Sequence, residues 1–261
     1  MNKLILLFLI LIAACGKTNT KSSLVRQDPN AYFAAQTIRV NVYFEPGAEP
    51  YTTTTFLHNE IPVPFPNWYF FEHNIKALFS GRKSYPSLIV PKTLSEMKVL
   101  PVQNEATWTI DEVVDLNKKQ ALSSSKAVMN IYFLNGRAAE NRNIIGFHIN
   151  GGGTIAIFKE VIREAASGET LPLVAEYVEQ TTLIHEVGHA LGLVNNGVPM
   201  VDSHQDKEHG AHCSNPDCVM YYANEGSEGL LKLARKLAKG EDPLKLSVVF
   251  DEHCLKDTKS Y

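Results

Sequence analysis

The chain has 261 residues, of which 44% are hydrophobic, 20% charged and 9% aromatic, a composition typical of a globular protein. This composition excludes a disordered, collagen-like or disulfide-dense scaffold, and four cysteines are too few to replace a hydrophobic core. A formal charge of −3 provides no basic surface for nucleic acid, so we expect no nucleic-acid partner.

The N-terminal segment has the pattern of a bacterial lipoprotein signal. Lys3 precedes the apolar run 4–12, which is too short to span a bilayer, and residues 12–15 read Ile-Ala-Ala-Cys. This sequence resembles the lipobox, in which a peptidase cuts before a cysteine that becomes acylated. We therefore expect residues 1–14 to be a signal peptide and acylated Cys15 to anchor the protein to a membrane of the bacterial cell envelope. The alternative is a plain secretory signal with an incidental cysteine.

Residues 15–30 are mostly polar, which predicts a flexible tether after the lipidated cysteine. The rest of the chain, 31–261, is expected to fold as one domain, with an N-terminal lobe over about 31–194 and a C-terminal lobe over about 195–261. We expect a monomer whose body lies in the periplasm or at the cell surface, where disulfides are permitted.

Hydrophobic patterns in the body predict a mixture of strands and helices. Runs rich in β-branched and aromatic residues predict strands over 37–44, 128–134, 144–148 and 154–158. Apolar residues at helical spacing predict helices over 68–79, 110–122 and 171–194. Thr109 and Glu112 form a capping box at the start of the second helix. Residues 82–105 contain three prolines and predict an irregular segment with one short strand, and the order of elements predicts an α+β fold with a mixed sheet.

A histidine motif lies in the last predicted helix, where residues 185–189 read His-Glu-Val-Gly-His, the HExxH pattern. Residues four apart share a helix face, so His185 and His189 can bind one zinc ion. Glu186 lies beside the pair and is the expected general base for zinc-bound water. Apolar neighbours predict burial, and buried histidine and glutamate side chains need a partner such as a metal. The motif therefore predicts one catalytic zinc ion.

A catalytic zinc usually takes three protein ligands, so the motif lacks one. Gly192 extends it to HExxHxxG, which resembles the metzincin clan of zinc peptidases, although Asn195 stands where the next histidine is expected. After an insertion, the chain reads HC-x4-C-x-M from His212 to Met220, which is similar to the segment after the glycine in archaemetzincins.

This resemblance implies an α+β metzincin-like catalytic domain with a backing helix, an active-site helix and a small C-terminal subdomain. It also implies that His212 is the third zinc ligand, that the chain turns sharply at Gly192, and that Met220 lies beneath the metal. Tyr222 matches the tyrosine of metzincins with an SxMxY sequence, whose hydroxyl can bind the metal or stabilise an oxyanion. The alternative third ligands are His209, His204 and Asn195.

The remaining three cysteines have three possible arrangements. Cys213 and Cys218 are close enough in sequence to bridge, and we expect a disulfide between them with Cys254 free. Archaemetzincins use the corresponding pair and a later CxxC to hold a second, structural zinc. This chain has no CxxC, but Cys213 and Cys218 could form a Cys3His site with His253 and Cys254. A bridge from Cys254 to either of the other two cysteines is also open.

The patterns together predict a zinc-dependent endopeptidase that acts on a peptide or protein. The resembled fold binds its substrate antiparallel to an edge strand, for which 154–158 is the candidate. One alternative is a gluzincin-type peptidase, whose third ligand is a glutamate; the candidates are Glu208, Glu225 and Glu228. The other is a non-catalytic surface lipoprotein that keeps the metal for structure or binding, a role in which Glu186 has no use as a base.

Overall fold

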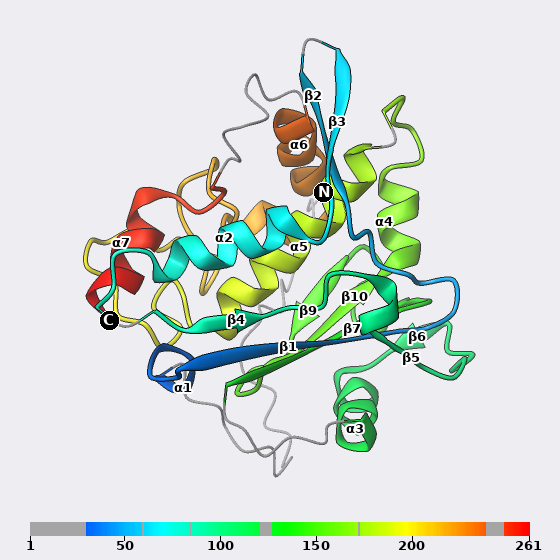
Figure 1. Ribbon diagram of the computed structural model, residues 1–261, viewed down its shortest axis with the longest axis horizontal. Coiled ribbons are helices and arrows are strands. Elements are labelled where there is room, and N and C mark those ends of the chain that lie inside the picture. The colour runs from blue at the N-terminus through cyan, green and yellow to red at the C-terminus, as the bar shows by residue number, and fades with distance from the viewer. Residues whose placement is uncertain (1–29, 59, 84, 121–126, 172, 239–247) are drawn as a thin grey trace, which may run out of the picture.

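The computed structural model describes residues 30–58, 60–83, 85–120, 127–171, 173–238 and 248–261, which form a sheet flanked by helices (Figure 1). The expected signal peptide, the acylated Cys15 and residues 15–29 of the tether lie outside this described part of the chain. So do the last two residues of the helix expected over 110–122. None of the described helices is long and apolar enough to span a membrane.

The central sheet is mixed and has six strands, in the order β4-β1-β7-β10-β9, with β5 also paired to β1. All of these pairings are parallel except that of β9, which runs antiparallel to β10. The strands are Thr37–Phe44 (β1), Ser87–Ile89 (β4), Lys98–Val99 (β5), Val128–Leu134 (β7), Gly146–His148 (β9) and Thr154–Phe158 (β10). Two small sheets pair Thr54–His58 (β2) with Ile61–Phe65 (β3) and Thr107–Trp108 (β6) with Arg137–Ala138 (β8).

Helices lie on both sides of this sheet. They are Asn30–Phe33 (α1), Tyr69–Phe79 (α2), Ile110–Gln120 (α3), Lys159–Ala165 (α4), Leu173–Ala190 (α5), Ser227–Ala238 (α6) and Glu252–Ser260 (α7), with 3-10 turns at Leu94–Glu96 (η1) and Tyr222–Glu225 (η2). In Figure 1, α2 and α5 lie on one side of the sheet and α3 on the other. Every residue of β7 is buried, as expected for a strand that is covered on both faces. The expected mixed sheet with backing helices is confirmed.

The strand that we expected at the sheet edge is an interior strand, so that prediction was wrong. Residues 154–158 form β10, which pairs with β7 on one side and with β9 on the other. All five of its residues are buried, and a continuous apolar run is typical of a strand covered on both faces. The edge next to α5 belongs instead to β9, the antiparallel strand.

Local sequence signals agree better with the structure. The backbone N–H of Thr109 donates to Glu112 Oε2 at 2.7 Å, and the N–H of Glu112 donates to Thr109 Oγ1 at 3.3 Å. The capping box at the start of α3 is therefore confirmed. Residues 82–105 contain two short strands and a 3-10 turn rather than one strand, because β4 and β5 pair with opposite ends of β1.

Polar contacts hold the N-terminal half of α5 in place. Glu179 Oε1 accepts a hydrogen bond from the backbone N–H of Tyr51 at 2.6 Å, and Glu176 Oε2 accepts one from that of Thr55 at 2.7 Å. Lys159, the first residue of α4, forms a buried ion pair with Glu179. Because buried charges are stable only when they are paired, these contacts fix α5 relative to β2 and α4.

The C-terminal end of α5 is a sharp turn. The helix ends at Ala190, and Gly192 takes a φ of 79°, a left-handed conformation that glycine adopts without a steric penalty. Val194 and Asn195 also have positive φ, at 53° and 60°. The chain therefore leaves the helix abruptly at the expected lobe boundary, while the division into two lobes stays a prediction.

Candidate metal centre

Helix α5 supplies the first two side chains of the site. His185 and His189 are buried, and their Nε2 atoms lie 3.0 Å apart. The two rings meet edge to face, with centroids 4.7 Å apart. The four-residue spacing places both imidazoles on one face of the helix, so the sequence order produces this arrangement directly.

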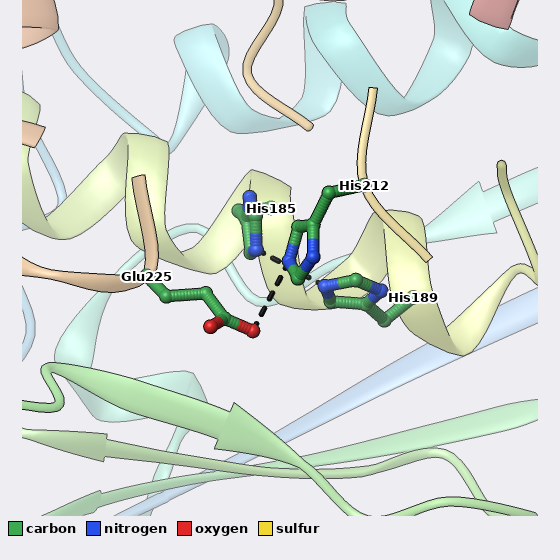
Figure 2. Close-up of side chains that lie close together, drawn as sticks. All are labelled: His185, His189, His212 and Glu225. Carbon is green, nitrogen blue, oxygen red and sulfur yellow. Dashed lines mark hydrogen bonds and ion pairs between the residues drawn. The ribbon is translucent and has the colours of Figure 1, made fainter. Parts of the chain in front are cut away.

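A third imidazole reaches the pair from the loop after the helix. The ring of His212 lies 5.4 Å from that of His185 and 4.9 Å from that of His189, measured between centroids. One nitrogen of each histidine and a carboxylate oxygen of Glu225 all lie within 4.8 Å of one another. Figure 2 shows the four side chains converging between α5 and the sheet. The structure thus brings together the histidines that the sequence proposed as ligands and one of the three alternative glutamates.

Backbone carbonyl groups orient two of these imidazoles. His185 Nδ1 lies 2.7 Å from the carbonyl oxygen of Val219, and His212 Nδ1 lies 2.5 Å from that of His209. A carbonyl oxygen only accepts hydrogen bonds, so each Nδ1 must carry the proton and each Nε2 faces the centre. This is the tautomer that a metal-binding histidine needs.

The donor set fits a metal ion. His212 Nε2 is buried and faces Oε1 of Glu225 at 3.0 Å, so without a proton on this nitrogen no donor would meet its lone pair. A buried nitrogen lone pair without a donor is unfavourable unless a proton or a cation meets it. Three imidazole nitrogens with a neighbouring carboxylate are ligands that suit zinc.

The electrostatics of the site keep two ligands neutral. Burial, followed by the nearby His212, lowers the pKa of His185 to about 4, and burial with the neighbouring imidazoles lowers the pKa of His189 well below its usual value. Burial opposes ionisation of Glu225, but the hydrogen bond and charge of His212 hold the pKa of that carboxyl below its usual range. Burial opposes the charged form of His212, but its hydrogen bond with Glu225 raises the pKa of His212, so in the metal-free site a proton lies where a cation would bind.

Glu186 is buried beside the ligands and touches the sheet edge. Burial, followed by the charge of Glu225, raises the pKa of Glu186 to about 8, and a backbone hydrogen bond from His148 acts in the opposite direction. Since His148 is the last residue of β9, this bond joins the candidate base to the outermost strand.

Met220 packs directly against the helix between the two histidines. It is fully buried, and a Cβ atom added at Gly188 would lie 2.3 Å from its Sδ. Gly188 therefore allows the close approach of Met220 to α5. The carbonyl oxygen of Met220 also accepts a hydrogen bond from the backbone N–H of Cys213 at 2.8 Å, which ties this contact to the residue after His212.

Among the other sequence candidates, the side chains of His204, His209, Glu208 and Glu228 lie outside the group formed by the three histidines and Glu225. The ring of Tyr222 stacks on that of His209 with centroids 3.6 Å apart. Asn195 Nδ2 lies 3.5 Å from Gln205 Oε1, away from the metal-ligand side chains. Glu208 and Glu228 are both exposed. The role expected for Tyr222 stays a prediction.

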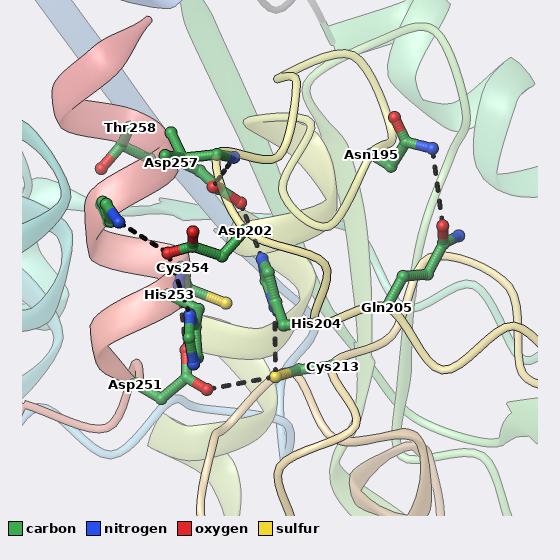
Figure 3. A network of polar contacts seen from close by, with 12 residues as sticks. Asn195, Asp202, His204, Gln205, Cys213, Asp251, His253, Cys254, Asp257 and Thr258 are labelled. Atoms are coloured by element: carbon green, nitrogen blue, oxygen red, sulfur yellow. Dashed lines mark hydrogen bonds and ion pairs between the residues drawn. The ribbon is translucent and has the colours of Figure 1, made fainter.

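A second cluster surrounds the cysteines (Figure 3). His204 Nδ1 lies 3.4 Å from Cys213 Sγ, and Cys218 Sγ lies 3.7 Å from Cys254 Sγ on α7. One ligand atom from each of His204, Cys213, Asp251 and Cys254 falls within 4.8 Å of the others. All three described cysteines are free, so the expected disulfide between Cys213 and Cys218 is absent from the described structure.

The histidine of this cluster is His204 rather than His253. His204 Nε2 lies 2.7 Å from Asp257 Oδ2, which directs Nδ1 towards the thiols. His253 is half exposed, and its Nδ1 lies 3.6 Å from Asp202 Oδ2. The alternative site with His253 does not match the structure, because on α7 the side chain of His253 faces Asp202 while that of Cys254 faces the interior.

Hydrogen bonds favour a thiolate in the second cluster. Bonds from the thiols of Cys218 and Cys254 hold the pKa of Cys213 well below its usual range. The backbone N–H of Asn215 lies 3.4 Å from Cys213 Sγ, and that of Asp251 lies 3.4 Å from Cys218 Sγ. Donors that point at the sulfur of Cys213 stabilise its ionised form, which is the form that binds metals, whereas the thiolate of Cys213 raises the pKa values of Cys218 and Cys254 in the metal-free protein.

Comparison with known proteins found similarity only among solved structures. No protein-family model and no curated protein matches the chain. The crystal structure of an archaemetzincin from Methanopyrus kandleri is 11% identical, with a TM-score of 0.46, over 86% of this chain and 95% of that one. A zinc-dependent peptidase from Methanocorpusculum labreanum is 12% identical, with a TM-score of 0.43, over 84% of this chain and 99% of that one.

Sequence reasoning missed three features of these two clusters. Gly188 stands inside the HExxH motif, where its small size was the available signal. Glu225 was weighed only as a replacement for His212, whereas both lie at the site. His204 was weighed only as a ligand of the first centre, and its distance in sequence from Cys254 gave no sign of their proximity.

Proposed function

We propose that the protein is a zinc-dependent endopeptidase of metzincin type. The observation that supports it best is the convergence of His185, His189 and His212 next to a buried Glu186 on the same helix. A structural zinc site is normally closed by ligands and needs no adjacent base. A buried carboxyl beside three imidazoles therefore favours hydrolysis over a purely structural role.

In this proposal the three imidazoles hold the zinc, which supplies a Lewis acid that activates water and polarises the peptide carbonyl. Glu186 accepts the proton of the attacking water and passes it to the leaving nitrogen. Its pKa of about 8 belongs to the metal-free site, and a nearby cation lowers the pKa of a carboxyl, so Glu186 would be ionised at neutral pH. The backbone hydrogen bond from His148 orients it.

The substrate would bind along β9 by strand addition. As the outermost strand next to α5, β9 has no partner strand on one edge among the described residues, although the N–H of His148 bonds to Glu186. An extended peptide can pair with such an edge through its main chain. Because the N–H of His148 contacts Glu186, a peptide on β9 would lie close to the base.

Metal analysis and a peptidase assay test this proposal. The full chain should bind zinc and cleave casein or a peptide library, and Glu186→Gln should retain the metal while it loses at least a hundredfold in kcat/KM. His212→Ala should lose zinc, whereas Glu208→Ala and Glu228→Ala should retain it. Equal activity in the wild type and Glu186→Gln would refute catalysis and favour the non-catalytic lipoprotein.

We also propose a second, structural zinc held by His204, Cys213 and Cys254, with Cys218, whose Sγ lies 3.7 Å from that of Cys254, as the fourth ligand in place of Asp251. Three thiolates and one imidazole form a closed Cys3His set, and the carboxylate of Asp257 would orient the imidazole. The full chain should then contain two zinc ions, and Cys254→Ser should contain one. A Cys218–Cys254 disulfide would instead leave two fewer titratable thiols under non-reducing denaturation, which would refute the second ion.

The membrane anchor at Cys15 is a separate proposal based on the lipobox-like sequence. Cells grown with a labelled fatty acid should incorporate label into the wild-type protein, which should fractionate with membranes. Cys15→Ser should remove both properties. Label in Cys15→Ser would show that another residue carries the lipid.

A further inference from the structure

The carboxylate of Glu225 has no assigned task in the proposed mechanism, although it lies among the metal-ligand side chains. It comes from the last residue of η2, and its Oε1 is 3.0 Å from His212 Nε2. Figure 2 shows this carboxylate directed at the imidazole of His212. Three histidines and a carboxylate would fill a four-coordinate zinc, which leaves no position for water or substrate.

The backbone next to Glu225 also meets the proposed substrate strand. Gly226 forms an antiparallel bridge with Ile144, two residues before β9. The carbonyl oxygen of Ile145 accepts a hydrogen bond from the backbone N–H of Phe158, the last residue of β10. In an extended chain, the backbone groups of successive residues face opposite edges of the strand. Ile144 therefore presents its backbone to the outer edge, the same edge that a bound peptide would use.

We propose that residues 222–226 form an internal latch that keeps the resting site closed. This inference rests on the proposed function. The carboxylate of Glu225 takes the place of the scissile carbonyl oxygen at the metal, and Gly226 takes the place of substrate backbone at the start of the strand edge. The segment thus imitates a bound peptide at two points, one through its side chain and one through its main chain.

The contacts suggest how the latch opens. The Glu225 side chain is 45% exposed, unlike the three buried imidazoles, so it can rotate into solvent without moving a packed group. The bridge between Gly226 and Ile144 is isolated rather than part of a ladder. A peptide that binds along β9 would displace both contacts and free the fourth position.

The test uses the full chain loaded with cobalt(II), whose visible absorption reports the ligands, and acetohydroxamate as a probe for an open position. The variants are Glu225→Ala, which removes the carboxylate, and Glu225→Asp, which keeps the charge but shortens the reach. Glu228→Ala is the matched control, because Glu228 is an exposed glutamate three residues further along. Metal content and thermal unfolding are measured for each protein first.

We expect both Glu225 variants to keep the metal, to show an altered cobalt spectrum and to bind acetohydroxamate at least tenfold more tightly than the wild type. Their kcat/KM for a peptide should rise several-fold, and Glu228→Ala should match the wild type. Unchanged spectra and hydroxamate affinity in Glu225→Ala would overturn the latch. Loss of metal in Glu225→Ala but not in His212→Ala would also overturn it, since Glu225 would then be the third ligand.

The two proposals fail separately in this experiment. If no protein cleaves a peptide, the proposed function fails, whereas the cobalt spectrum and the hydroxamate affinity still report whether Glu225 occupies a position on the metal. If the wild type cleaves peptides as fast as Glu225→Ala and binds hydroxamate as tightly, the function stands and the latch is refuted.

Discussion

Replacement of Gly188 by alanine tests the packing beneath the metal-binding histidines. The added Cβ would lie 2.3 Å from Met220 Sδ, well inside normal contact distance, and overpacking of a buried site typically costs about 1–3 kcal/mol. Alanine is favoured over glycine within a helix by about 1 kcal/mol, which offsets part of that cost. We therefore expect Gly188→Ala to lower the free energy of unfolding by up to about 2 kcal/mol.

The assay is denaturant unfolding of the metal-free protein, together with zinc affinity by chelator competition. Met220→Ala leaves a cavity and should cost about 2–5 kcal/mol by itself. In the double variant the new methyl group occupies part of that cavity. The loss of unfolding free energy in the double variant should therefore be smaller, by at least about 1 kcal/mol, than the sum of the losses in the two single variants. A Gly188→Ala protein that is more stable than the wild type would refute this account of the contact.

Two further predictions concern the supports of the site. Lys159→Met leaves Glu179 buried without its partner and should lower the unfolding free energy by about 3–5 kcal/mol in denaturant titration. The double variant with Glu179→Gln removes the buried charge but keeps an oxygen acceptor for the N–H of Tyr51, so it should recover most of this loss; equal stability of the two variants would contradict this prediction. Hydrogen bonds from Thr109 hold the pKa of Glu112 below its usual value. The ionised Glu112 carboxylate therefore stabilises the fold at a pH above its unfolded-state pKa, and this stabilisation disappears as the pH falls through its folded-state pKa. Thermal unfolding of the wild type and Glu112→Gln should therefore differ at neutral pH and converge in acid, and a difference independent of pH would exclude the capping carboxylate as its source.

The features that were predictable from sequence are those set by local geometry. His185 and His189 share a face because they are four residues apart, and the Thr109 capping box spans a single turn of chain. The strands over 37–44 and 128–134 also have the expected bounds, since alternation and β-branched residues were unambiguous there.

The features that were not predictable depend on contacts between distant segments. The short separation in sequence favoured a disulfide between Cys213 and Cys218. In the structure, however, Sγ of Cys254 on α7 lies 3.7 Å from Sγ of Cys218. The sequence run at 154–158 was taken as an edge because nothing local shows which neighbour strand follows. Glu225 reaches the histidines only through the turn that precedes α6, whose path is set by tertiary packing.

The second cluster makes the two proposed centres depend differently on α7. Its thiols lie on both sides of α6, since Cys213 and Cys218 precede that helix and Cys254 follows it. All ligands of the histidine centre precede α7 in the chain, whereas the cysteine cluster is incomplete without Cys254 on α7. If both proposed centres bind metal, detachment of α7 would leave the three histidines in the remaining chain but expose Cys213 and Cys218 to oxidation.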